Sequence, residues 1–141
     1  MFFKNLGPQS LSSWLTGGEP LLRRGLADFI RELKAVKGIN RVGLTTNGVL
    51  LEEQLEALSK AGLDAVNISI NTMDREKFSR LTMTDSMINI VSVIDHALKT
   101  GFEVKVNTVM IRGFNEDEIT AIAGLAKTRN IAARFIGERA G

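Results

Sequence analysis

The sequence predicts an α/β fold, in which a sheet of about five parallel strands carries helices on its outer face. Two observations support this prediction. Apolar residues recur with the 3.6-residue period of an amphipathic helix in four segments, and short β-rich runs lie before, between and after them. Each pair of successive runs is separated by enough chain for one helix. Right-handed βαβ crossovers and a parallel sheet therefore follow.

The β-rich runs are the predicted strands. Four of them combine β-branched residues with alternation, and a shorter one precedes two glycines near the start of the chain. In chain order the predicted strands are 13–15, 41–45, 65–70, 103–110 and 133–136.

Glycines mark the predicted ends of three helices. The apolar stripes place the helices at 26–36, 51–58, 87–98 and 119–126. After the first three come Gly38, Gly62 and Gly101, where a left-handed C-cap is expected. Before the fourth, Asn115 and Glu118 have the spacing of a capping box.

Four of the predicted strands carry polar residues along one side, whereas strands of a covered parallel sheet usually read as continuous apolar runs. We interpret this side as the lining of a polar cavity, and the alternative is a sheet face open to solvent. The polar positions are Thr45 and Asn47, then Asn67, Ser69 and Asn71, then Lys105 and Asn107, and last Arg134.

Composition excludes several classes of protein. The 141 residues contain no cysteine, which rules out disulfides and thiolate metal sites within this chain. A net charge of +2 gives no indication of a nucleic-acid surface, and no apolar run has the length of a membrane span. Residues 1–13 do not resemble a signal peptide, so we expect a cytoplasmic protein with neither a nucleic-acid nor a membrane partner.

The segment Gly17-Gly18-Glu19-Pro20 directly follows the first predicted strand. Glycines there let backbone groups approach a ligand closely, and Glu19 would lie at the carboxyl end of the sheet, where α/β proteins bind ligands. The alternative is a tight turn between strand and helix, with no ligand.

Six motifs in a fixed order resemble a known family. They are LTGGEPLLRR, GLTTNG, AGLDAVNISINTMD, VKVNTV, GFNEDEI and RFI, between Ser13 and Glu138. Together they resemble the radical S-adenosylmethionine (SAM) superfamily and, within it, the GTP 3′,8-cyclases of molybdenum cofactor biosynthesis. The resemblance implies an incomplete, TIM-like (βα) barrel over residues 13–141, and residues 1–12 match no family segment.

The resemblance also implies ligand roles. Residues that match the SAM-binding positions are Gly17, Gly18, Glu19, Pro20 and Ser69; those that match GTP-binding positions are Thr45 and Lys105. Candidate lining residues of the same cavity are Asn47, Asn67, Asn71, Asn107 and Arg134. In the family, SAM and two 4Fe-4S clusters act on GTP. The roles of Arg23 and Arg24 stay open, and solvated positions at the helix entry are the simplest interpretation.

The chain also departs from the family pattern. It lacks the cysteines that hold both clusters, and Trp14, Asn71, Gly137 and Arg139 replace an arginine, an acid, a glutamate and a methionine of the family. Without a cluster, SAM cleavage cannot start. We therefore expect a core fragment that begins at the second barrel strand and is catalytically incomplete alone. His96 is expected on the surface of its helix rather than to act as a base.

Three functions follow from these observations. The first is a truncated GTP cyclase of the radical SAM type. The second is a non-catalytic α/β protein that binds a nucleotide or SAM through the cavity. The third is a scaffold that acts only with a partner supplying the missing strand. Cysteine codons beside the reading frame would favour the first. For the isolated chain we expect self-association through the open edges of the strands at 13–15 and 133–136.

Overall fold

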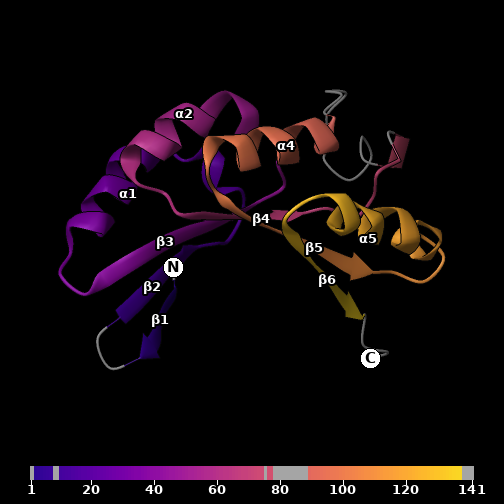
Figure 1. Ribbon diagram of the computed structural model, residues 1–141, viewed down its shortest axis with the longest axis horizontal. Helices are drawn as coiled ribbons and strands as arrows, with labels where there is room; N and C mark the ends of the chain where they lie inside the picture. Colours follow the sequence, from indigo (N-terminus) through magenta and orange to yellow (C-terminus); the bar gives the residue numbers. More distant parts are fainter. Residues whose placement is uncertain (1, 8–9, 75, 78–88, 138–141) are drawn as a thin grey trace.

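A computed structural model describes residues 2–7, 10–74, 76–77 and 89–137. Its six-stranded sheet has the order β1-β2-β3-β4-β5-β6. The strands from β2 to β6 pair in parallel, and β1 pairs antiparallel with β2. The predicted set of five parallel strands is confirmed. The sheet is curled but not closed, as in part of a barrel (Figure 1).

Most strands and helices match or extend the predicted segments, whereas β4 and α1 each end one residue earlier. The strands are β1 (Phe2–Gly7), β2 (Ser10–Leu15), β3 (Ile39–Thr46), β4 (Ala65–Ser69), β5 (Glu103–Met110) and β6 (Ile131–Gly137). The α-helices are α1 (Leu26–Ala35), α2 (Leu51–Ala61), α4 (Ile90–Thr100) and α5 (Ile119–Thr128), and the short 3-10 helices are η1 (Pro20–Leu22) and η2 (Glu116–Glu118). Met87, which begins a predicted helix, lies outside the described residues.

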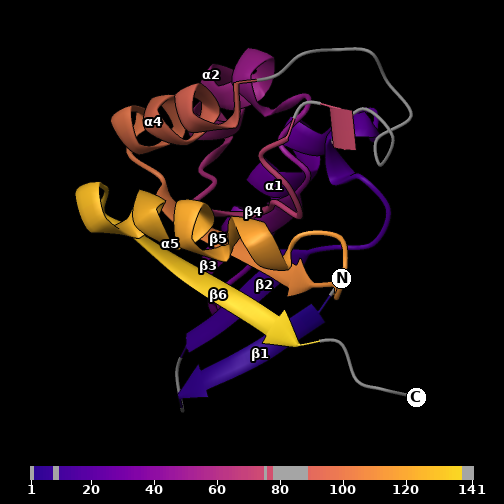
Figure 2. The ribbon, with the colours of Figure 1, turned by 90° about the vertical axis from the view of Figure 1, so that its right-hand side faces the viewer.

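The four α-helices lie on one side of the sheet, as Figures 1 and 2 show from two directions. The apolar positions of the strands face these helices and are almost fully buried. The strand residues of this core are Val42, Leu44, Val66, Ile68, Val104 and Val106. Burying each such side chain stabilises the fold by about 1.5–3 kcal/mol, so this layer holds the helices to the sheet. No helix in the described ranges is long and apolar enough to cross a membrane.

Two of the three predicted glycine caps are confirmed. Gly62 (φ 98°) ends α2 and Gly101 (φ 106°) ends α4, both in the left-handed conformation. The third prediction is wrong: α1 ends at Ala35 with Val36 as its C-cap. Gly38 has a positive φ of 97°, but it belongs to the turn into β3.

The predicted capping box at the start of α5 is also wrong. The side chain of Asn115 is 1% exposed and turns toward the sheet, where its Oδ1 accepts a hydrogen bond from the Ile111 amide. Its Nδ2 donates to the carbonyl oxygens of Asn71 (2.8 Å) and Val109 (2.7 Å). Three hydrogen bonds therefore replace one local cap, and the bond to Asn71 joins the loops that follow β4 and β5.

The expected open edge at residues 13–15 is wrong as well. Residues 2–7 form β1, which pairs with β2 from Phe2 opposite Trp14 to Gly7 opposite Ser10. Of the described strands, β1 and β6 lie at the two edges of the sheet. The expected edge at 133–136 is confirmed as part of β6.

Candidate functional site

Parallel pairing arranges the polar strand residues in rows across the sheet. Thr45 on β3 pairs with Asn67 on β4, which pairs with Lys105 on β5. Lys105 pairs with Ala132 on β6, which completes the row. Residues paired in register point to the same face, so these four side chains lie next to one another. The next row toward the carboxyl ends contains Ser69, Asn107 and Arg134.

These rows line a cavity of about 420 Å³ on the face opposite the helices. A cavity of this size is within the usual range for small-molecule sites. Its lining residues are Trp14, Thr16, Thr45, Asn67, Lys105, Asn107, Ala132 and Arg134. Two of them are cations and none is an acid, so the cavity favours an anionic ligand.

Three of the eight polar strand residues predicted to line the cavity do not line it. Ser69 is half-buried in the row beside Asn107. The Oδ1 of Asn47 accepts a hydrogen bond from the Val49 amide (3.0 Å), and the Oδ1 of Asn71 accepts one from the Val109 amide (3.2 Å). Both asparagines thus hold the backbone at the carboxyl ends of strands.

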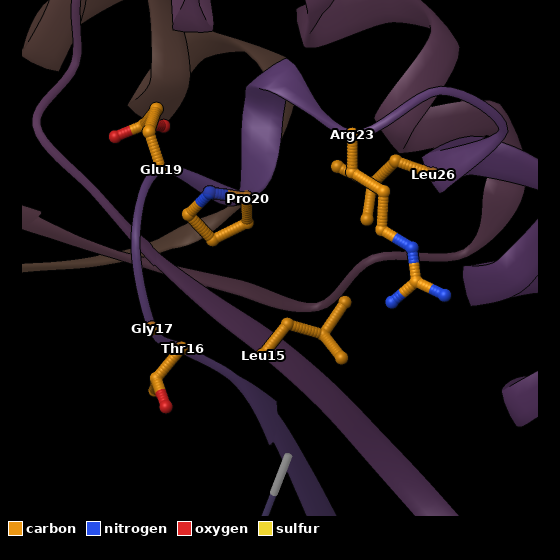
Figure 3. A pocket seen from close by; sticks show the side chains of 7 residues that line it. All are labelled: Leu15, Thr16, Gly17, Glu19, Pro20, Arg23 and Leu26. Atoms are coloured by element: carbon orange, nitrogen blue, oxygen red, sulfur yellow. The ribbon is translucent and has the colours of Figure 1, made fainter.

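The Gly-Gly-Glu-Pro segment borders a smaller cavity of about 150 Å³ between β2 and α1. Figure 3 shows Leu15, Pro20 and Leu26 around it, with Arg23 at one side. Thr16 lines both this cavity and the larger one, so the two are neighbours. Gly17 (φ 87°) and Gly18 (φ 57°) have positive φ, and a Cβ on either would meet no atom within 4 Å. The loop backbone is therefore open to an approaching ligand.

The carboxylate of Glu19 joins this loop to the carboxyl end of β3. Its Oε1 accepts from the Thr46 hydroxyl (2.5 Å), and its Oε2 accepts from the Asn47 amide (2.9 Å). The Leu21 amide donates a longer bond of 3.4 Å to Oε1. A carboxylate has about four acceptor positions, so one position remains for a ligand donor.

The remaining charged candidates lie at the surface. Arg23 and Arg24 are exposed, and the guanidinium of Arg23 lies 4.6 Å from the centre of the Phe29 ring. His96 is exposed on α4 and pairs with Glu52 on α2. The larger cavity is lined by none of these three residues.

Comparison with known proteins agrees with the observed fold. The sequence profile of the radical SAM superfamily matches residues 8–126. This chain belongs to the radical SAM superfamily.

Relatives within the superfamily include two enzymes named GTP 3′,8-cyclase. The one from Chlorobaculum tepidum is 47% identical over 122 residues, covering 86% of this chain and 37% of the relative. The one from Aquifex aeolicus is 42% identical over 135 residues, which cover 95% of this chain and 42% of the relative. Molybdenum cofactor biosynthesis protein 1 of Drosophila melanogaster is 39% identical over 122 residues, which cover 86% of this chain and 22% of that protein. The chain thus spans less than half the length of these relatives.

Radical SAM proteins use SAM and 4Fe-4S clusters. The cluster does not fit the residues present, because the chain has no thiolate to ligate iron. Within the described ranges, no three His, Asp or Glu side chains are grouped closely enough to hold a metal. SAM fits better, since the open glycines and the spare acceptor position of Glu19 suit a ligand with an ammonium group.

The sequence analysis did not predict the roles of two pairs of residues in this radical SAM fold. Trp14 and Thr16 line the cavity from β2 and its carboxyl end, and their two-residue spacing was a usable signal. Asn115 and Glu118 bind other loops, and nothing in their local pattern distinguishes this from a cap.

Glu118 joins the loop after β5 to the loop after β4. Its carboxylate accepts hydrogen bonds from the Thr72 hydroxyl (2.7 Å), the Met73 amide (2.7 Å) and the Lys77 ammonium (3.3 Å). Burial alone would raise the pKa of Glu118, but the bonds from Thr72, Met73 and Lys77 outweigh it and lower this pKa below its ordinary value of 4.5.

Replacing Glu118 by Gln should therefore destabilise the protein in a pH-dependent way. The folded pKa is lowered, so the ionised group stabilises the fold above about pH 4.5 and loses that effect as the pH falls. At neutral pH we expect a loss of about 1.5–3 kcal/mol in the free energy of unfolding, measured by urea denaturation. The difference from wild type should shrink in acid.

The matched control is Glu32→Gln at an exposed position of α1 beyond its first turn, which removes the same charge. It should leave the unfolding midpoint nearly unchanged at each pH. A Glu118→Gln deficit that stays constant down to about pH 3 would refute the role of the ionised carboxylate.

Proposed function

We propose that this chain forms the SAM- and GTP-binding walls of a GTP 3′,8-cyclase of molybdenum cofactor biosynthesis. The observation that carries the proposal is the row Thr45, Asn67 and Lys105, with Arg134 nearby, in a cavity without acids. A triphosphate suits two cations, and amide and hydroxyl groups suit a base and a ribose. The relatives named GTP 3′,8-cyclase support the choice of ligand.

In this proposal the two cavities take different ligands. The backbone of Gly17 and Gly18, the carboxylate of Glu19 and the turn fixed by Pro20 hold the methionine end of SAM, while Ser69 binds SAM from β4. Thr45 and Lys105 bind GTP. Thr16 borders both cavities, which makes the two ligands neighbours.

The remaining predicted lining residues divide into two groups. Asn67, Asn107 and Arg134 present polar groups to GTP from β4, β5 and β6. For Asn47 and Asn71 we propose support of the neighbouring loops, since each side-chain oxygen already accepts a backbone hydrogen bond.

A second candidate function is binding without catalysis, and the two cavities that the chain's own residues line support it. In the superfamily, SAM supplies radical chemistry once a cluster reduces it, and this chain cannot hold that cluster. The residues described here would then bind and orient ligands only. Under the first candidate, the same residues do this within a longer assembly that supplies the thiolates.

Iron–sulfide reconstitution tests the catalytic incompleteness of the chain. Under anaerobic conditions we expect no stoichiometric 4Fe-4S absorbance, because no thiolate is present. With SAM and a strong reductant, chromatography should detect no 5′-deoxyadenosine. Accumulation of that product by the purified chain would show that it is catalytically complete.

Replacing Lys105 by Ala tests the nucleotide site. GTP binding should weaken by about 1–3 kcal/mol in isothermal titration, the range for a charge-assisted hydrogen bond. Lys99→Ala removes the same charge from an exposed position on α4 and should leave the affinity unchanged. Equal affinities for wild type and Lys105→Ala would place Lys105 outside the site.

We also propose that the isolated chain self-associates through β1 and β6. Both strands leave one row of backbone groups unpaired within the described sheet, and Ile136 on β6 is 43% exposed. Ile136→Lys should shift sedimentation toward the monomer, because a charged edge disfavours pairing. Val36→Lys, at an exposed position away from the edge, should not. A wild-type chain that sediments as a monomer at high concentration would contradict this proposal.

A further inference from the structure

Trp14 lies against Gly43, its register partner on the neighbouring strand β3. A Cβ on Gly43 would be 2.6 Å from Cζ3 of the indole and 2.8 Å from both Cε3 and Cη2. Nearly equal distances to three consecutive ring carbons put this Cβ over the face of the ring, not beyond its edge. Real Cβ contacts are essentially never below 3.0 Å, so the ring position requires glycine at residue 43.

The same indole lines the larger cavity and is its one large apolar side chain. The ammonium of Lys105 lies over the ring, 5.9 Å from its centre, which is within the range of a cation–π interaction. Two strands separate Trp14 from Lys105, so the ring extends across the cavity floor. Strand β3 supports it from below at Gly43.

A neighbouring lining residue has an unmet hydrogen bond. The Oδ1 of Asn67 is buried and has no partner among the described residues. An unpaired buried acceptor costs free energy. Asn67 also lines the cavity, so its side-chain amide is a candidate partner for a polar group of a ligand.

We infer that Trp14 is a ligand-binding residue of this cavity and that its indole stacks on a planar heteroaromatic ring such as a purine base. The inference rests on the proposed function, which places a nucleotide here, and adds which side chain binds the base. When the base stacks, Lys105 leaves the indole for the phosphates. That exchange is favourable, since a charge-assisted hydrogen bond is stronger than an exposed cation–π contact.

The fluorescence of Trp14 tests this without any substitution, since it is the only tryptophan of the chain. Saturation with GTP should quench the emission strongly, because the base covers the indole. Inorganic tripolyphosphate, which has the charges but no base, should bind with much weaker quenching. GTP binding seen by calorimetry without a change in emission would overturn the inference.

Substitution of Trp14 gives the second test. Trp14→Leu should weaken GTP binding about 5- to 150-fold, as expected for loss of one base–aromatic stack, and should not weaken tripolyphosphate binding. Trp14→Phe keeps an aromatic face and should retain most of the affinity.

Gly43→Ala should act like Trp14→Leu, because the new Cβ displaces the ring. The double variant should be no weaker than Trp14→Leu alone. Gly124→Ala, where a Cβ meets no atom within 4 Å, is the matched control and should bind like wild type.

The outcomes separate the two proposals. If Trp14→Leu binds GTP as tightly as wild type does, the stacking role is wrong and the nucleotide site stands. If wild type binds neither GTP nor tripolyphosphate, the nucleotide site and the stacking role both fail.

Discussion

The cavity depends on the register between parallel strands. Register sets Thr45, Asn67 and Lys105 side by side on one face and leaves Leu44, Val66 and Val104 to the helices on the other. Side chains alternate with a period of two, so a slip of one residue on any strand would exchange the two faces. It would bury a lysine or asparagine under the helices and expose a branched aliphatic residue. The apolar layer that stabilises the fold therefore also positions the binding residues.

Much of this arrangement follows from the sequence because its causes are local. Alternation of Asn67 and Ser69 with Val66 and Ile68 is sufficient to predict a two-faced strand, and Gly62 is sufficient to predict the end of a helix. The sheet face toward which each side chain points can therefore be predicted without knowing which distant residues it contacts. The parallel order of the strands follows in the same way from the helices between them.

The remainder depends on partners that are distant in sequence. Asn115 has the local pattern of a cap, but the distant Asn71 carbonyl offers its side chain a partner that a cap would leave unused. Pairing of β1 with β2 depends on backbone groups, which carry no sequence pattern of their own. The position of Glu19 in the chain predicted a ligand contact. It did not predict the hydrogen bonds from Thr46 and Asn47, through which the Glu19 carboxylate connects its loop to the carboxyl end of β3.

One wall of the cavity consists of the edge strand β6, which carries Ala132 and Arg134. An edge strand has a neighbour on one side only, so it opens locally at a lower free energy than the central strands do. We therefore expect Arg134 to leave the cavity more often than Lys105, whose strand is paired on both sides. An anion that bridges these two cations would slow the fraying of β6. Ligand affinity and the local stability of this strand are therefore thermodynamically coupled.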